Sequence, residues 1–124
     1  MRVPIQYAIG YPERLTGELE PFDLTKAALT FEEPDRKAFP CLDLGYWAGR
    51  TGRSAPAVLN AADEVAVAAF LEGKIGFLAI ADIVAATLDR IPVADVTTVA
   101  DVLAVDGEAR KVAAGFVEVN VRAG

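Results

Sequence analysis

The prolines divide the chain into two parts that must fold differently. Five of the seven prolines lie in the first 40 of the 124 residues, and each removes a backbone donor and restricts the residue before it. This part predicts a short N-terminal helix, with Pro4 in its first turn and Pro12 at its end, and then an extended arm over residues 15–39. Within the arm, Leu29 and Phe31 predict a short strand.

Helical periodicity begins after Pro40. It predicts a helix from about residue 42 that Gly49 and Gly52 end, and then helices over about 56–71 and 80–91 and a last helix or helix pair over 98–117. The helix over 56–71 is apolar around much of its circumference, so we expect it to be central.

The ends of these helices carry recognisable signals. Gly73 is the expected C-cap of the second helix, Pro92 ends the third, and Thr98 followed by Asp101 resembles a capping box. The predicted fold class is mainly α: an N-terminal helix and an extended linker arm (residues 1–39), followed by an antiparallel four-helix bundle (residues 40–124).

Composition excludes several kinds of function. The chain has no histidine, which removes the commonest general base and metal ligand. A net charge of −6 without a basic stripe argues against nucleic-acid binding. No apolar run is long enough to cross a membrane and no signal peptide is evident, so we expect a soluble, cytoplasmic protein. Cys41, the one cysteine, is expected to be a small buried apolar side chain.

Other polar residues are better explained by structure than by chemistry. Arg50 and Arg53 lie in a glycine-containing stretch that lacks the phosphate-loop spacing, and we interpret it as a loop between helices. Ser54, without a histidine, is expected to be a helix N-cap. The acidic residues do not converge as metal ligands would, and Asp82 and Asp89 fall on a solvated helix face. We therefore predict no catalytic, cofactor-binding or metal-binding residue.

Asn60 and Glu64 are the exception that calls for an explanation. Their spacing places both on one side of the most apolar helix, where a buried polar group must be paired. We expect this polar pair to hydrogen-bond the backbone of a neighbouring loop, which is a structural role.

Several segments at consistent spacing resemble one protein family over essentially the whole chain. The strongest is Ala57-Val58-Leu59-Asn60-Ala61-Ala62-Asp63-Glu64-Val65-Ala66-Val67-Ala68-Ala69-Phe70-Leu71, and the others are Met1-Arg2-Val3-Pro4-Ile5-Gln6-Tyr7-Ala8, Tyr11-Pro12-Glu13-Arg14, Leu29-Thr30-Phe31, Phe39-Pro40-Cys41-Leu42 and Lys74-Ile75-Gly76-Phe77. In this order they resemble the C-terminal region of the 1-deoxy-D-xylulose 5-phosphate reductoisomerase family. Asp63 stands where that family is expected to have asparagine.

The resemblance implies a fragment of an enzyme. The family converts 1-deoxy-D-xylulose 5-phosphate to 2-C-methyl-D-erythritol 4-phosphate in isoprenoid precursor synthesis, with NADPH and a divalent metal, Mg or Mn. It implies that residues 1–39 are the end of the central catalytic domain plus a linker arm, and that 40–124 are the C-terminal bundle. The dinucleotide-binding domain and most of the catalytic domain are the implied missing partners, and a homodimer is implied for the complete enzyme.

The resemblance also carries one site residue and leaves alternatives open. Met1 matches a methionine that touches substrate in the family. We expect the chain alone to bind no cofactor and to be inactive. The alternative is a free-standing helical interaction or dimerisation module derived from the family tail, and a small independent lyase or isomerase is a weaker third reading.

Overall fold

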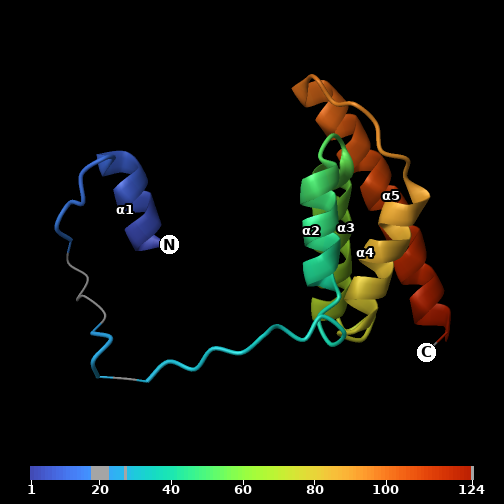
Figure 1. Cartoon of the computed structure of the whole chain (residues 1–124). Helices are drawn as coiled ribbons and strands as arrows, with labels where there is room; N and C mark the ends of the chain where they lie inside the picture. Colours follow the sequence, from blue (N-terminus) through green and yellow to red (C-terminus); the bar gives the residue numbers. More distant parts are fainter. Residues whose placement is uncertain (18–22, 27, 124) are drawn as a thin grey trace. The chain divides into compact units, whose positions relative to one another are not determined.

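The computed structural model describes residues 1–17, 23–26 and 28–123, with side chains as far as Val121. The described residues contain five helices and no strand, and they divide into two compact units, Met1–Glu32 and Glu33–Gly124. Figure 1 shows both units. The mainly α class is confirmed, whereas the short strand predicted at Leu29 and Phe31 is wrong, because both residues lie in irregular chain. None of the helices in the described residues is long and apolar enough to cross a membrane.

The first unit is built around helix α1 (Arg2–Gly10). Pro4 lies in its first turn, as predicted. The side-chain amide of Gln6 donates to the backbone carbonyls of Leu15 and Thr16, at 3.0 and 3.2 Å, and so folds the following chain back on the helix. No residue of α1 is buried. The helix therefore presents its apolar side chains to solvent in this structure.

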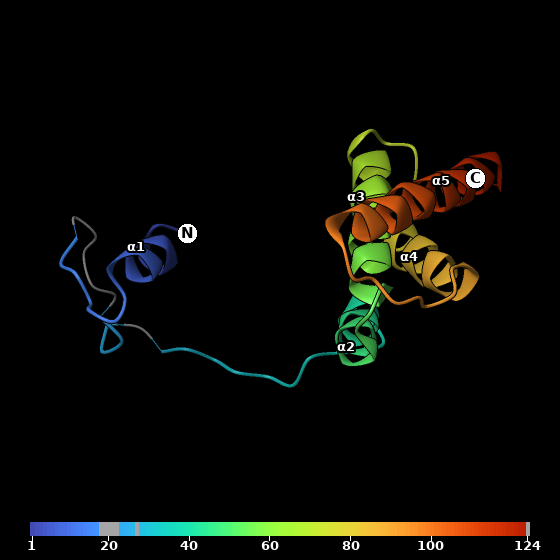
Figure 2. The same cartoon turned by 90° about the horizontal axis from the view of Figure 1, so that it is seen from above.

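The second unit contains the four predicted bundle helices. They are α2 (Cys41–Thr51), α3 (Ala55–Leu71), α4 (Ala79–Arg90) and α5 (Val99–Ala123). Successive helices run in opposite directions, as Figure 1 shows, and Figure 2 shows α5 crossing α3 obliquely. The last segment forms one continuous helix, which settles the choice between a helix and a helix pair.

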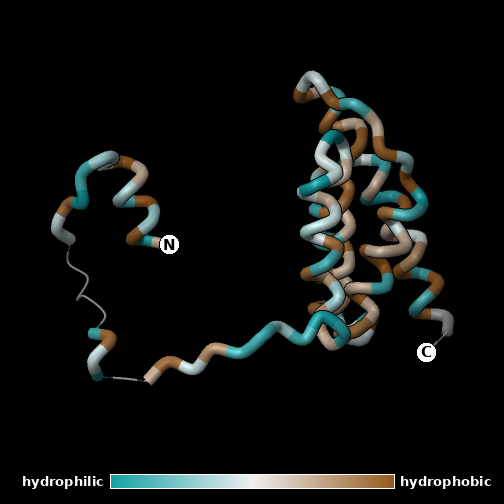
Figure 3. The backbone as a smooth tube through the Cα atoms, in the orientation of Figure 1, coloured by the Kyte–Doolittle hydropathy of each residue, from teal (hydrophilic) through white to brown (hydrophobic). Residues whose placement is uncertain are grey.

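Helix α3 is the central element of this unit, as predicted, and it contacts α2, α4 and α5. Teal and brown segments alternate along the tubes of α4 and α5 in Figure 3, as expected for helices with one apolar face. The core joins alanines of α3 and α5 to larger side chains of α4, where Ile83 is 1% exposed. Thr87 is also buried there, and its hydroxyl is satisfied by donating to the carbonyl of Ile83 at 2.7 Å.

The two ends of α3 form different hydrogen bonds. At its C-terminus Gly73 has φ +71°, the amide of Gly73 donates to Phe70 O, and the amide of Lys74 donates to Ala69 O. These two bonds form a Schellman motif, which confirms the predicted glycine cap.

At the N-terminus of α3, Ser54 occupies the N-cap position but makes no side-chain bond to the helix. Its fully buried hydroxyl accepts instead from the backbone amide of Ala94 at 2.8 Å, in the α4–α5 connection. The Ser54 amide donates to Ala94 O in return, at 3.0 Å. The predicted capping role of the Ser54 side chain is therefore wrong. The side chain instead links the α2–α3 connection to the α4–α5 connection.

The predicted capping box at the start of α5 is confirmed. Thr98 Oγ1 accepts from the backbone amide of Asp101 at 3.1 Å, and an Asp101 carboxylate oxygen accepts from the Thr98 amide at 2.8 Å. The same oxygen also accepts from the amide of Thr97 at 3.0 Å. These bonds, the Thr97 amide first, lower the pKa of Asp101 from 3.8 to about 2.

This capping box makes stability depend on pH in the acid range. Because the pKa of Asp101 is lower in the folded chain than its ordinary value of 3.8, its contribution is present above about pH 4 and is lost as pH falls toward 2. We predict that Asp101→Asn lowers the melting temperature at pH 6 and removes part of its decrease between pH 4 and 2. Thermal unfolding followed by circular dichroism measures both, and an unchanged pH profile would contradict the assignment.

Candidate functional site

The polar side chains of the bundle form one network between α3 and α5. Asn60 Nδ2 donates to Glu64 Oε1 at 3.0 Å, and an Arg110 guanidinium nitrogen donates to Glu64 Oε2 at 2.7 Å. Arg110 is also held by Asp106 one turn earlier on α5, with Nε to Oδ2 at 2.7 Å. The guanidinium therefore joins carboxylates from two helices that are distant in sequence.

This arrangement corrects the prediction for Asn60 and Glu64. Both residues are exposed, and they bond each other and Arg110 instead of the backbone of a loop. The apolar surroundings of the helix suggested burial, but the two side chains are exposed, and Glu64 reaches Arg110 of the neighbouring α5. The partner, Arg110, lies 46 residues away in the sequence, and no local pattern identified it.

The hydrogen bonds of this network favour the charged forms of Glu64 and Arg110. The hydrogen bond from Arg110, followed by that from Asn60, lowers the pKa of Glu64 below its ordinary value. Hydrogen bonds to Asp106 and Glu64 raise the pKa of Arg110. Glu64 and Arg110 therefore keep their charges near neutral pH, and neither is poised to exchange a proton there.

The other predicted positions are separate from this network. Arg53, at φ +55°, forms an ion pair with Asp95, and the guanidinium of Arg50 lies 5.3 Å from the ring centre of Tyr46. Met1 precedes α1 and is 91% exposed, and its contact with substrate stays a prediction. Cys41 is exposed, which contradicts the burial predicted for it, because it is the first residue of α2 and lies at an open groove.

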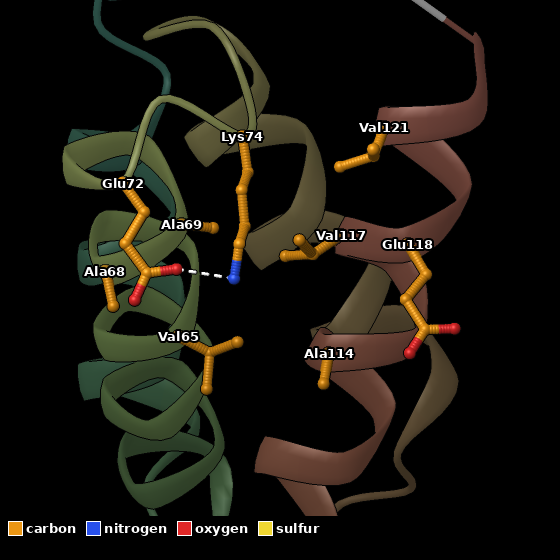
Figure 4. Close-up of a pocket in the computed structure, with 9 residues that line it drawn as sticks. All are labelled: Val65, Ala68, Ala69, Glu72, Lys74, Ala114, Val117, Glu118 and Val121. Atoms are coloured by element: carbon orange, nitrogen blue, oxygen red, sulfur yellow. Dashed lines mark ion pairs between the residues drawn. The ribbon is translucent and has the colours of Figure 1, made fainter.

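Two mostly apolar grooves on the second unit offer contact surfaces. The first, the α3–α5 groove, has a volume of about 530 Å³ and is drawn in Figure 4. Its walls are apolar and Lys74 reaches into it to pair with Glu72. It is lined by Val65, Ala68, Ala69, Glu72, Lys74, Ala114, Val117, Glu118 and Val121.

The second groove lies at the opposite side of α3. This α2–α4 groove has a volume of about 710 Å³ and is mostly apolar, with Lys37, Asp63 and Asp82 as its charged members. It is lined by residues 37–41, Asp63, Val67, residues 77–78 and residues 80–82. Sequence periodicity did not indicate either groove, because each is lined by segments that are far apart in the sequence.

The grooves and the polar network described above are features of surfaces that contact other protein. Within the described part of the chain, no three histidine, cysteine, aspartate or glutamate side chains come close enough to hold a metal ion. The structure has apolar grooves, exposed apolar side chains and a network of charged residues that links α3 to α5. The fold and these surfaces define a helical-bundle domain suited to contact with other protein.

Comparison with known proteins identifies the kind of domain. Residues 1–112 match the family described as the DXP reductoisomerase C-terminal domain. The chain therefore belongs to the 1-deoxy-D-xylulose 5-phosphate reductoisomerase family, of which it represents the C-terminal part.

Curated relatives agree with this assignment. The chain is 52% identical over 114 residues to the reductoisomerase of Dechloromonas aromatica and 47% identical over 118 residues to that of a Janthinobacterium species. These alignments cover 91% and 94% of the chain but only 29% and 30% of the two relatives. The chain thus spans about 30% of the length of the relatives that it matches.

Solved structures give the same result for the fold. The reductoisomerase of Zymomonas mobilis in complex with NADPH superposes with a TM-score of 0.86 at 46% identity, over 94% of this chain and 31% of that protein. A DOX-P reductoisomerase in complex with NADPH, fosmidomycin and magnesium gives 0.83 at 36% identity, over 94% and 31%. The helical bundle is therefore the arrangement that the family uses.

The Glu64–Arg110 bond should appear as an energetic coupling between α3 and α5. We predict that Glu64→Gln and Arg110→Met each lower the melting temperature, and that the double variant loses less than the sum of the two. Since the folded chain lowers the pKa of Glu64, the coupling is present above its ordinary value of 4.5 and is lost as pH falls below it.

A matched control distinguishes the loss of the Glu64–Arg110 bond from the loss of a negative charge alone. Glu108 is exposed on the same helix as Arg110 and forms no ion pair among the described residues, so Glu108→Gln should show no coupling to Arg110→Met. Additive effects of Glu64→Gln and Arg110→Met at pH 7 would contradict the role assigned to this bond.

Proposed function

We propose that this chain is the C-terminal part of an NADPH-dependent reductoisomerase that converts 1-deoxy-D-xylulose 5-phosphate to 2-C-methyl-D-erythritol 4-phosphate in isoprenoid precursor synthesis. The observation that carries the proposal is the family match over residues 1–112, together with identities near 50% to curated enzymes with that name. Its role in the enzyme is structural, and the bundle braces the catalytic domain.

The cofactors belong to the part of the enzyme outside this chain. The described residues do not fit either group: no phosphate-binding glycine fingerprint precedes a helix, histidine is absent, and no three acidic side chains converge. The related structures contain NADPH and magnesium. We place both in the dinucleotide-binding and central domains, and we assign this chain no step in the reaction.

The two ends of the chain serve different domains in this proposal. Residues 1–39 complete the catalytic domain and form the linker arm, and residues 40–124 form the bundle. The division into units Met1–Glu32 and Glu33–Gly124 supports a boundary in this region. Met1, which is exposed beside a helix without buried residues, is the one residue that we propose to contact substrate once the catalytic domain is complete.

The assembled enzyme is proposed to be a cytoplasmic homodimer, and the chain alone to be inactive. We predict that the 124-residue chain does not oxidise NADPH with 1-deoxy-D-xylulose 5-phosphate and magnesium or manganese. A fusion protein should be active in the same assay. It joins the region of the Dechloromonas aromatica enzyme that precedes the matched segment to Met1 of this chain.

Each arm of this assay has a control. The truncated Dechloromonas aromatica region alone should be inactive, which shows that this chain supplies what is missing. Activity of the chain by itself would overturn the proposal that it lacks the catalytic machinery. An inactive fusion protein that unfolds cooperatively would contradict its role in the reductoisomerase.

The alternative, a free-standing interaction module, has one observation in its favour. Phe77 and Leu78 are adjacent in the connection before α4 and are 59% and 73% exposed, and neighbouring apolar side chains exposed in this way often mark a contact surface. Sedimentation of the chain alone distinguishes the two proposals: a stable oligomer combined with an inactive fusion protein favours the module.

A further inference from the structure

The α2–α4 groove is a concave apolar surface with exposed apolar side chains on its lining. Phe39 and Phe77 are each 59% exposed and Leu78 is 73% exposed. Val67 and Ile80 line it from α3 and α4. A surface of this shape and composition leaves apolar area in water that a bound segment would remove.

Three charged side chains of the groove form no ion pair within the part of the chain that the structure describes. They are Lys37, Asp63 and Asp82. By contrast, Arg36, directly before Lys37, pairs with Asp43 at 2.7 Å. The two aspartates give the groove an excess of negative charge that a basic side chain would complement.

The groove lies where the polypeptide arrives at the bundle. Residues 37–41 form one of its walls, and they are the last residues before α2 and its first residue. The chain covers about 30% of the length of its relatives, and it matches their C-terminal domain. Most of the polypeptide of such an enzyme therefore reaches the bundle through the segment that forms this wall.

From these observations we propose that a segment of the remainder of the enzyme docks in the α2–α4 groove, with an aromatic or aliphatic side chain over Val67 and Ile80 and a basic side chain facing Asp63 and Asp82. The proposal rests on the proposed function, since the occupant is the part of the reductoisomerase outside this chain. In this proposal, the groove is the surface through which the bundle supports the part of the reductoisomerase outside this chain.

Cys41 reports on the occupancy of the groove. It is the one cysteine of the chain, lines the groove and is exposed. Partial burial, followed by the charge of Asp63, raises the pKa of its thiol. The alkylation rate of Cys41 with iodoacetamide, followed by mass spectrometry of its peptide at one fixed pH, therefore measures access to the groove.

The test compares Cys41 in the 124-residue chain and in the Dechloromonas aromatica fusion protein. We predict that alkylation is slower in the fusion protein by about tenfold or more, because the docked segment must leave before the reagent can enter. The Leu71→Cys variant is the control, since Leu71 is 77% exposed and does not line this groove. Its introduced thiol should react at equal rates in both proteins.

A second pair of variants tests the charge. Asp82→Asn should speed the alkylation of Cys41 in the fusion protein, because the docked basic side chain loses a partner. Asp89→Asn removes an exposed carboxylate from the same helix outside the groove and should leave the rate unchanged. Equal effects of the two substitutions would overturn the proposed basic occupant.

The remaining outcomes separate this inference from the proposed function. An active fusion protein in which Cys41 reacts as fast as in the chain alone overturns the docking and leaves the proposed function standing. A folded but inactive fusion protein with a protected Cys41 supports the docking and contradicts the proposed function. Protection of Cys41 that rises with the concentration of the chain alone identifies a second copy as the occupant and overturns the proposal, as does equal protection of the Leu71→Cys thiol.

Discussion

Close packing through alanine determines the architecture of the bundle. Among the described residues, eight of the fifteen buried apolar side chains are alanines. Ala61, Ala62 and Ala66 on α3 are fully buried, as are Ala109 and Ala113 on α5. Since the distance between helix axes depends on the side chains at the contact, alanine on both helices allows a short separation. The larger side chains of α4, such as Ile83, then complete the core.

The features that the sequence predicted correctly depend on residues close together in the chain. The periodicity of α3, α4 and α5 located their apolar faces, and the local signals at Gly73, Thr98 and Asp101 located helix ends correctly, because each acts within four residues of itself. The central position of α3 followed from the same patterns, whereas the choice between one last helix and a helix pair was settled by the structure. The bounds of α2, α3 and α4 agreed to within a few residues, whereas α5 continues to Ala123, beyond the end predicted at residue 117.

The contacts between distant segments could not be predicted in this way. Ser54 bonds Ala94, and Glu64 bonds Arg110, across 40 and 46 residues respectively. Each of these side chains is equally compatible with a local cap or a solvated face, and only the packing of α3 against its neighbours selects the distant partner. Cys41 and the grooves were missed for the same reason, since the groove that Cys41 lines combines segments far apart in the sequence.

The same packing supports the structural role that we propose for the chain. A core supplied largely by alanine and aliphatic side chains holds the helices together, and charged residues such as Arg110 add contacts between them. The most direct test of this account is the free energy of unfolding of two matched variants, Ala66→Leu at a fully buried position of α3 and Ala68→Leu at an exposed position of the same helix. The account predicts a loss of about 1–3 kcal/mol for Ala66→Leu, from overpacking, and little change for Ala68→Leu. Equal stabilities of the two variants would contradict it.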